Sequence, residues 1–375
     1  MAGLRWRLST AASRHVRERT AVYHTPRPAR YTARRGLRLF RRRPAHAVAE
    51  DITYIRARSV AEAVSQLSGG GALLMAGGTD LPESLRLEGA RTSKVVDISG
   101  IAELRGFTPT PDGGLRIGAL TSLTDLAASP VVRERYVALA RAAESVNPPV
   151  ARERGTLGGN VCQRPRCWYL RSGATCIRHG GDLCLAADGE NKYHGIIGSD
   201  ACHMVHPSDI APALVALEGR ARSMGPAGLR VTPFGEFFLP PGRSLVRENI
   251  LGPADVLTDV LLPPVPPGWR STYRRVSEAG TDYALASVAA TMLIVEGRIV
   301  QLTIVLGAAA PMPWRAVEAE TVLLGHIPDL VAIAQAADAA MADAMPLAEN
   351  RYKVGLFRAL LIDSLAEVAG LRPQA

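Results

Sequence analysis

Apolar and polar positions begin to alternate in an orderly way at residue 52. In the first third of the chain, short apolar runs predict strands at 52–55, 72–75, 94–98 and 115–120. Helical spacing of apolar residues predicts helices at 59–67, 122–128 and 131–146. Ser59 and Glu62 form a capping-box pair at the start of the first helix. Because helices and strands follow one another without strict alternation, the pattern favours an α+β fold.

Residues 151–206 interrupt this pattern, because they are rich in Gly, Cys and Arg and show little periodicity. They predict an insert made mostly of loops. Regular spacing resumes with a predicted helix at 208–217 and strands at 221–223, 229–232 and 256–262. The proline-rich segment 263–268 predicts an extended linker. After it, the pattern predicts strands at 271–276, 284–295 and 299–306 and helices at 313–324, 329–344 and 349–369.

These patterns divide the chain into a first domain at 51–262 and a smaller α+β domain at 269–371, preceded by a basic extension at 1–50. The formal net charge is +9, but residues 1–49 hold thirteen Arg and one acid, so the rest of the chain has a net charge of −3. Aromatic residues among these arginines are compatible with a nucleic-acid-binding arm. These residues include too few regularly spaced apolar side chains to form a core. This favours the alternative, a disordered extension or translated sequence upstream of a start near Val48.

Targeting and membrane signals are weak in this sequence. No apolar run approaches the roughly 20 residues that cross a bilayer, and no apolar stretch follows the basic N-terminal residues as in a secretion signal. The arginine run at 41–43 is followed by Pro44-Ala45-His46, which disfavours a twin-arginine signal. We therefore expect no membrane span and a cytoplasmic protein. Export to the periplasm with a partner is the alternative.

Two glycine-rich turns offer candidate phosphate contacts. The first, Ala76-Gly77-Gly78-Thr79-Asp80-Leu81, links a predicted strand to a predicted helix. The second, residues 155–160, adds hydroxyl and amide side chains to a Gly158-Gly159 pair. Glycine permits the positive φ angles and the close backbone approach that a pyrophosphate requires. Neither turn matches a Rossmann fingerprint or a P-loop.

These two segments, followed by Ser208-Asp209-Ile210-Ala211-Pro212-Ala213-Leu214, occur in an order that resembles the FAD-binding subunit or domain of the xanthine dehydrogenase and carbon monoxide dehydrogenase family of molybdenum hydroxylases. The resemblance covers about residues 52–371. It implies a vanillyl-alcohol-oxidase-like (PCMH-type) FAD-binding domain of two subdomains, followed by the smaller C-terminal domain.

The resemblance also implies which residues contact FAD. The pyrophosphate loop comprises Leu74, Met75, Ala76, Gly77, Gly78, Thr79, Asp80 and Leu81. The other implied contacts are Thr156, Gly159, Asn160, Asp209, Leu257 and Arg274. Among these, Arg274 is expected near the isoalloxazine ring, where its charge would balance reduced flavin, although some relatives carry lysine there. For Asp209 an equally weighted reading is a helix N-terminal acid favoured by the helix dipole.

All five cysteines lie between residues 162 and 202, which implies a shared role. Their odd number and the lack of a secretion signal disfavour disulfides. Zinc stays open, although the paired C-x-x-C knuckles of zinc ribbons are absent. A 4Fe-4S cluster is favoured, with Cys167, Cys176, Cys184 and Cys202 as ligands and Arg166, Arg171, Arg178 and His179 as surrounding positive groups.

Two further observations bear on this cluster. Residues 163–169 are similar to a subset of the family that inserts such a cluster at about 162–206, including the flavin subunits of periplasmic aldehyde oxidoreductases. Cys162 directly follows the second glycine turn and is expected to pack near the flavin. Four histidines in or near the insert are expected to be ordinary loop or partner-facing residues rather than ligands: His179, His194, His203 and His206.

The function implied by the resemblance is electron transfer. A partner large subunit would hold the molybdenum cofactor and oxidise substrate, a small subunit would hold 2Fe-2S clusters, and this chain would pass electrons through FAD to an external acceptor. The substrate would then be chosen by the partner. Two alternatives stay open: a stand-alone flavin oxidase of the same fold, and a zinc-bearing nucleic-acid-binding protein. The acidic body of the chain argues against a nucleic-acid partner.

Overall fold

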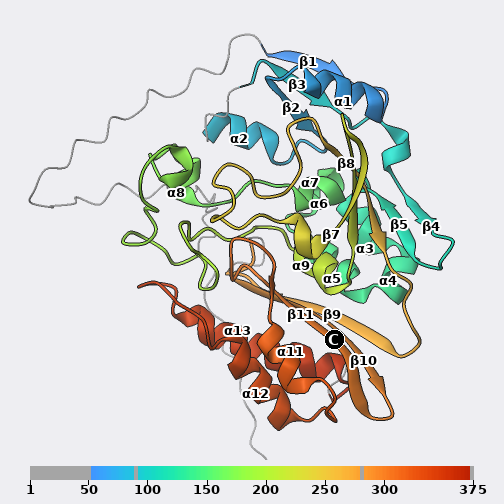
Figure 1. The fold of residues 1–375 in the computed structure, drawn as a ribbon, viewed down its shortest axis with the longest axis vertical. Helices are drawn as coiled ribbons and strands as arrows, with labels where there is room; N and C mark the ends of the chain where they lie inside the picture. The colour runs from blue at the N-terminus through green and yellow to red at the C-terminus, as the bar shows by residue number, and fades with distance from the viewer. Residues whose placement is uncertain (1–51, 88–91, 279–282, 372–375) are drawn as a thin grey trace, which may run out of the picture. The chain divides into compact units, whose positions relative to one another are not determined.

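A computed structural model describes residues 52–87, 92–278 and 283–371 (Figure 1). Residues 1–50, the predicted basic extension, lie outside the described residues. The described part contains three sheets together with helices, so the α+β prediction is confirmed. Within this part of the chain, no helix is long and apolar enough to span a bilayer.

The first sheet is parallel and has the order β1-β3-β2. Its strands are β1 (Thr53–Arg56), β2 (Ala72–Met75) and β3 (Lys94–Asp97). Helix α1 (Val60–Ser68) connects β1 to β2 and buries Ala63, Val64 and Leu67 against the sheet. The edge strand β2 leads into a turn and then into α2 (Leu81–Leu87), so the first glycine segment lies at the carboxyl end of an edge strand (Figure 1).

The second sheet is antiparallel, with the order β4-β5-β8-β6-β7. Its strands are β4 (Phe107–Pro109), β5 (Leu115–Gly118), β6 (Arg220–Gly225), β7 (Gly228–Pro233) and β8 (Val256–Leu262). The helices of this domain are α3 (Leu123–Ala128), α4 (Pro130–Arg135), α5 (Val137–Ser145), α6 (Pro149–Arg154), α7 (Leu157–Val161), α9 (Ile210–Ala216) and α10 (Phe234–Phe237). Among them, α7 packs on β8, and α10 packs on β6 and β7. The insert between α7 and α9 contains only α8 (Trp168–Arg171) and the single turn η2 (Ile177–His179).

The C-terminal sheet is antiparallel and has the order β12-β11-β10-β9. Its strands are β9 (Trp269–Val276), β10 (Ala286–Val295), β11 (Arg298–Gly307) and β12 (Trp314–Arg315), and its helices are α11 (Val317–Leu323), α12 (Leu330–Ala340) and α13 (Tyr352–Val368). Alternate residues of the strands face opposite sides. Ala289 and Val305 belong to a core shared with α5 and α9, whereas Val288 and Ile304 pack with α11, α12 and α13. The sheet therefore joins the two halves of the described chain.

Three predicted helices differ from the structure. The helix predicted at 329–344 ends at Ala340. The helix predicted at 131–146 is broken at Tyr136, whose backbone is not helical (φ −128°, ψ 53°). The ring of Tyr136 is fully buried and its hydroxyl donates to the carbonyl of Pro263 (2.8 Å), so tertiary contacts outweigh helical periodicity there. The helix predicted at 313–324 starts late, because Trp314 and Arg315 pair with β11 instead.

The start of α13 holds part of the insert in place. Lys353 is fully buried, and its ammonium donates to the carbonyls of Tyr193 (3.3 Å), His194 (3.1 Å) and Ala308 (2.9 Å). Burial lowers the pKa of Lys353 to about 7. Asn350 donates to the carbonyl of His194 as well (3.1 Å). The segment between Cys184 and Cys202, two of the predicted cysteine ligands, is thus anchored to the C-terminal domain.

Candidate functional site

The first glycine turn has the form of an anion-binding loop. Gly78 has a left-handed backbone (φ +70°), and a Cβ placed there would meet only the sulfur of Met75, at 3.9 Å. The backbone N–H groups of Gly77, Gly78 and Thr79 donate to no other residue that the structure describes. Successive unpaired N–H groups in a left-handed turn form a concavity that binds phosphate oxygens. The residues present therefore fit a pyrophosphate.

The second glycine turn lies directly against the first. A Cβ on Gly77 would come within 1.8 Å of the carbonyl oxygen of Arg154, so only glycine permits this contact. Most backbone N–H groups of the second turn are used internally, since Leu157, Gly158 and Gly159 donate to Thr121, Ala119 and the Thr156 hydroxyl. Side chains of this turn, rather than its backbone, are left to reach a ligand.

Asn160 connects the second turn to helix α9. Its carbonyl oxygen accepts from the Ser208 hydroxyl (2.6 Å), while its amide nitrogen donates to no residue in the described part of the chain. Leu257 of β8 lies on the other side of the turn, where its Cδ2 is 3.4 Å from the position of a Cβ on Gly158. The structure thus brings together the segments containing Gly77, Asn160, Ser208 and Leu257, which are far apart in the sequence.

Asp209 is fully buried and has protein partners for both carboxylate oxygens. It accepts from the Tyr273 hydroxyl (2.5 Å) and forms an ion pair with Arg275 (2.8 Å). Burial raises the pKa of Asp209, and Arg275 opposes that shift. Asp209 is the N-cap residue of α9 by position, but its side chain makes no capping hydrogen bond. Its side chain holds β9 against α9 rather than capping the helix.

Arg274 points to the opposite face of β9. Its Nε donates to Glu367 of α13 (2.6 Å), which also pairs with Arg141 of α5. Residues 274 and 275 face opposite sides because side chains alternate along a strand. Arg275, which was not among the site residues predicted from the sequence, lies on the side of the sheet that carries Asp209.

The four predicted cysteine ligands line one small pocket in the insert. Cys167, Cys176, Cys184 and Cys202 share it with Arg178 and apolar residues such as Leu170 and Met204. Cys162 is not among the residues that line it. Across residues 52–87, 92–278 and 283–371, no three His, Cys, Asp or Glu side chains are close enough to hold a single metal ion. The pocket is thus a shared site for four thiols without the spacing of a single-ion centre.

Nitrogen atoms approach three of these sulfurs. His194 Nε2 lies 3.3 Å from the sulfur of Cys167, the backbone N–H of His203 is 3.5 Å from Cys184, and Arg178 Nε is 3.4 Å from Cys202. A hydrogen bond from the Cys184 thiol and the charge of Arg178 lower the pKa of Cys202 to about 5. Burial raises the pKa of Cys167 to about 11. The Cys184 hydrogen bond and the Arg178 charge therefore favour the thiolate form of Cys202.

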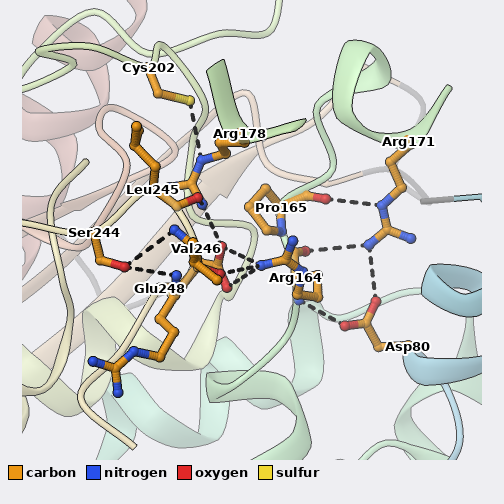
Figure 2. A network of polar contacts seen from close by, with 11 residues as sticks. Asp80, Arg164, Pro165, Arg171, Arg178, Cys202, Ser244, Leu245, Val246 and Glu248 are labelled. Atoms are coloured by element: carbon orange, nitrogen blue, oxygen red, sulfur yellow. Dashed lines mark hydrogen bonds and ion pairs between the residues drawn. The ribbon is translucent and has the colours of Figure 1, made fainter. Parts of the chain in front are cut away.

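A polar network joins the first glycine turn to this pocket (Figure 2). The carboxylate of Asp80 accepts from the backbone N–H of Arg164 (2.8 Å) and pairs with Arg166 (2.9 Å) and Arg171 (3.1 Å). Arg166 and Arg171 also pair with Glu83 of α2. These two arginines are therefore engaged with carboxylates and do not line the cysteine pocket.

The second half of the network contains a residue that sequence reasoning missed. Glu248 is buried, and it accepts from both Arg164 (2.7 Å) and Arg178 (2.7 Å). No sequence motif marks Glu248, which lies in a long irregular segment between α10 and β8. Only the fold brings its carboxylate between the glycine turn and the cysteines.

The fold, the glycine turn and the relatives define a class of flavin-binding protein. The family profile described as the FAD binding domain in molybdopterin dehydrogenase matches residues 50–265. The CO dehydrogenase flavoprotein C-terminal domain matches residues 271–368. The chain belongs to the FAD-binding medium subunits of the carbon monoxide, xanthine and aldehyde dehydrogenase family of molybdenum hydroxylases, and is thus a subunit of an oxidoreductase.

Individual relatives agree with this assignment. The chain is 36% identical to the aldehyde oxidoreductase FAD-binding subunit PaoB of Escherichia coli (strain K12), over 84% of this chain and 97% of that protein. It is 30% identical to the carbon monoxide dehydrogenase medium chain of Hydrogenophaga pseudoflava, over 80% and 88%. The crystal structure of carbon monoxide dehydrogenase from Hydrogenophaga pseudoflava that lacks the Mo-pyranopterin moiety superposes with a TM-score of 0.69 at 28% identity, covering 85% and 98%.

Proposed function

We propose that this chain binds FAD at the two glycine turns and transfers electrons within a molybdenum hydroxylase complex. Electrons would arrive from a large subunit with the molybdenum cofactor and a small subunit with 2Fe-2S clusters, and would leave to an external acceptor. The observation that carries the proposal is the left-handed turn at Gly78 with its unpaired N–H groups. FAD, when bound, accepts electrons singly or in pairs and so connects one-electron carriers to two-electron reactions.

Each part of the site has a distinct role in this proposal. The backbone from Leu74 to Leu81 binds the pyrophosphate, and the side chains of Thr156 and Asn160 orient it from the second turn. Leu257 and the Gly158-Gly159 pair supply an apolar wall. Because Asp209 and Arg274 have protein partners for their charges, we propose that they shape the site through Tyr273, Arg275 and Glu367.

We also propose that Cys167, Cys176, Cys184 and Cys202 hold a 4Fe-4S cluster. Three properties of the pocket support it: four thiols share one site, nitrogen atoms approach three of the sulfurs, and Arg178 supplies positive charge. Thiolates are the usual ligands of such clusters, and nearby donors tune them. The resident compartment we propose is the cytoplasm, with co-export by a partner as the alternative.

The electron-transfer role is tested on the complex isolated from its native host under non-denaturing conditions. We expect intact mass spectrometry to show this chain with two further subunits, and absorbance spectra to show flavin bands with a broad iron-sulfur shoulder. A chain isolated without partners that oxidises a substrate by itself would instead establish a stand-alone oxidase. A colourless zinc protein would exclude both.

Replacing Cys184 by Ser should lower the iron content to a quarter or less of the wild-type value while most FAD stays bound. The reason is that a hydroxyl is a poor substitute for a thiolate ligand, whereas the glycine turns lie outside the pocket. Metal analysis and flavin absorbance of the purified variant measure both quantities. Cys162→Ser is the matched control, because Cys162 does not line the pocket, and it should keep wild-type iron. Equal iron in both variants would remove Cys184 from the ligand set.

A further inference from the structure

Arg178 is the one arginine that lines the cysteine pocket in the described part of the chain. It lies on the turn η2, two residues after Cys176, and its side chain is only 2% exposed. Its Nε is 3.4 Å from the sulfur of Cys202. Burial of a guanidinium is costly unless its charge and its donors are matched by partners. The partners around Arg178 must therefore offset the cost of burying its charge.

The two edges of this guanidinium face different partners. Nη1 donates to Glu248 (2.7 Å) and to the carbonyl of Leu245 (3.1 Å). The geometry of the group is a rigid fork, in which Nε and Nη2 share the other edge. That edge is the one directed at Cys202, as Figure 2 shows for Nε. Nη2 is buried and has no hydrogen-bond partner among the described residues. Nη2 is therefore a charged donor without a hydrogen-bond partner, on the edge that faces the Cys202 sulfur.

The charge of Arg178 is only partly offset. The single negative charge of Glu248 is shared between Arg178 and Arg164. Both the charge and the hydrogen bond to a ligand sulfur favour the more negative, reduced form of an iron-sulfur cluster, which raises its reduction potential.

We infer that Arg178 is a positioning residue that raises the reduction potential of the iron-sulfur cluster, by donating to the Cys202 sulfur and by holding a buried positive charge beside it, and that Glu248 limits this effect. The inference rests on the proposed 4Fe-4S cluster. It assigns the two residues effects of opposite sign: loss of Arg178 lowers the potential, whereas loss of the Glu248 charge raises it. A residue that only stabilised the insert would not produce such a pair.

The experiment uses the complete complex, with wild-type protein and the variants Arg178→Gln, Arg178→Lys and Glu248→Gln. Iron content is measured first, and the cluster is then titrated against potential by electron paramagnetic resonance. We expect Arg178→Gln to lower the midpoint by at least a tenfold change in the reduction equilibrium, about 59 mV for a one-electron couple. Arg178→Lys keeps the charge but not the fork, so it should restore part of the shift. Glu248→Gln should move the midpoint upward.

The outcomes distinguish a failure of this inference from a failure of the proposed 4Fe-4S cluster. Wild-type complex without iron overturns the cluster itself. If all the proteins contain iron and the midpoint potential of Arg178→Gln is unchanged, the role of Arg178 is overturned. The proposal of a cluster is not affected by that result. If Arg178→Gln loses its iron, the midpoint potential of Glu248→Gln tests the inference instead. An upward shift of this midpoint supports the inference, and a downward shift or no shift overturns it.

Discussion

Replacing Gly78 by Leu should leave the purified subunit with less than a tenth of the wild-type FAD. The Cβ would enter the open side of the turn, where only the Met75 sulfur lies within 4 Å, and would block approach to the N–H groups of residues 77–79. Hydrogen bonds to a charged group are worth about 1.5–3 kcal/mol each. Losing two of them weakens binding by roughly 100-fold or more. Flavin absorbance after gel filtration and titration with FAD measure the loss.

Gly70→Leu is the matched control for this variant. Gly70 has nearly the same left-handed backbone (φ +73°) and no atom within 4 Å of a Cβ, but it follows α1. Both variants place a side chain in a strained left-handed conformation at a cost of about 1–2 kcal/mol, so thermal stability should fall equally. Only Gly78→Leu should lose FAD. Equal flavin content in the two proteins would show that the turn does not hold the cofactor. Gly77 is unsuitable for this test, because any side chain there meets the Arg154 carbonyl.

Replacing Glu367 by Gln should destabilise the protein by about 3 kcal/mol, toward the lower end of the range for breaking a buried ion pair. Glu367 is fully buried, and it accepts from Arg141 of α5 and from Thr272 (3.1 Å) and Arg274 (2.6 Å) of β9. The neutral amide removes the negative charge with which both arginines pair. Denaturant unfolding at pH 7 gives the free energy of unfolding. Asp338→Asn, which breaks the exposed pair with Arg358 in the same domain, is the control and should cost less than about 1 kcal/mol.

The effect of Glu367 should also depend on pH. Burial raises the pKa of this carboxyl, but Arg141 and Arg274 outweigh it, so the pKa in the folded protein lies below its ordinary value. A carboxyl with a depressed pKa contributes stability that is complete above the pKa of the unfolded chain, about 4.3, and is lost as the pH falls through the lower folded value. The difference between wild type and Glu367→Gln should therefore be constant from pH 7 to about 5 and shrink below pH 4. A difference that stayed constant to pH 3 would contradict this account.

The local features of the site were predictable from the sequence. Gly77, Gly78 and the Gly158-Gly159 pair were selected because close backbone approach and positive φ angles require glycine, and the structure places the two turns in contact. The confinement of five cysteines to one segment predicted a shared site, and four of them line one pocket. Strands such as β8 were predicted to the residue, because buried strands have sharp ends in an apolar pattern. These features depend on residues that are close in the sequence.

Features that depend on distant residues were not predictable. Nothing near Glu248 shows that Arg164 and Arg178 will share its carboxylate. The break at Tyr136 follows from a hydrogen bond to Pro263, more than a hundred residues later. The choice between Arg274 and Arg275 depends on which face of β9 meets α9, and that face is set by sheet packing rather than by local sequence. The network in Figure 2 combines several such long-range pairs.

The alternation of side chains along β9 constrains the number of residues in this strand more strictly than the residue type at each position. Two adjacent arginines reach buried carboxylates on opposite faces of the sheet, Arg274 to Glu367 and Arg275 to Asp209. A deletion or insertion of one residue within β9 would exchange the faces of every side chain after it. Both arginines would then point away from their carboxylates at once. A single substitution in β9 removes at most one of these ion pairs, whereas a one-residue insertion or deletion before Arg274 removes both.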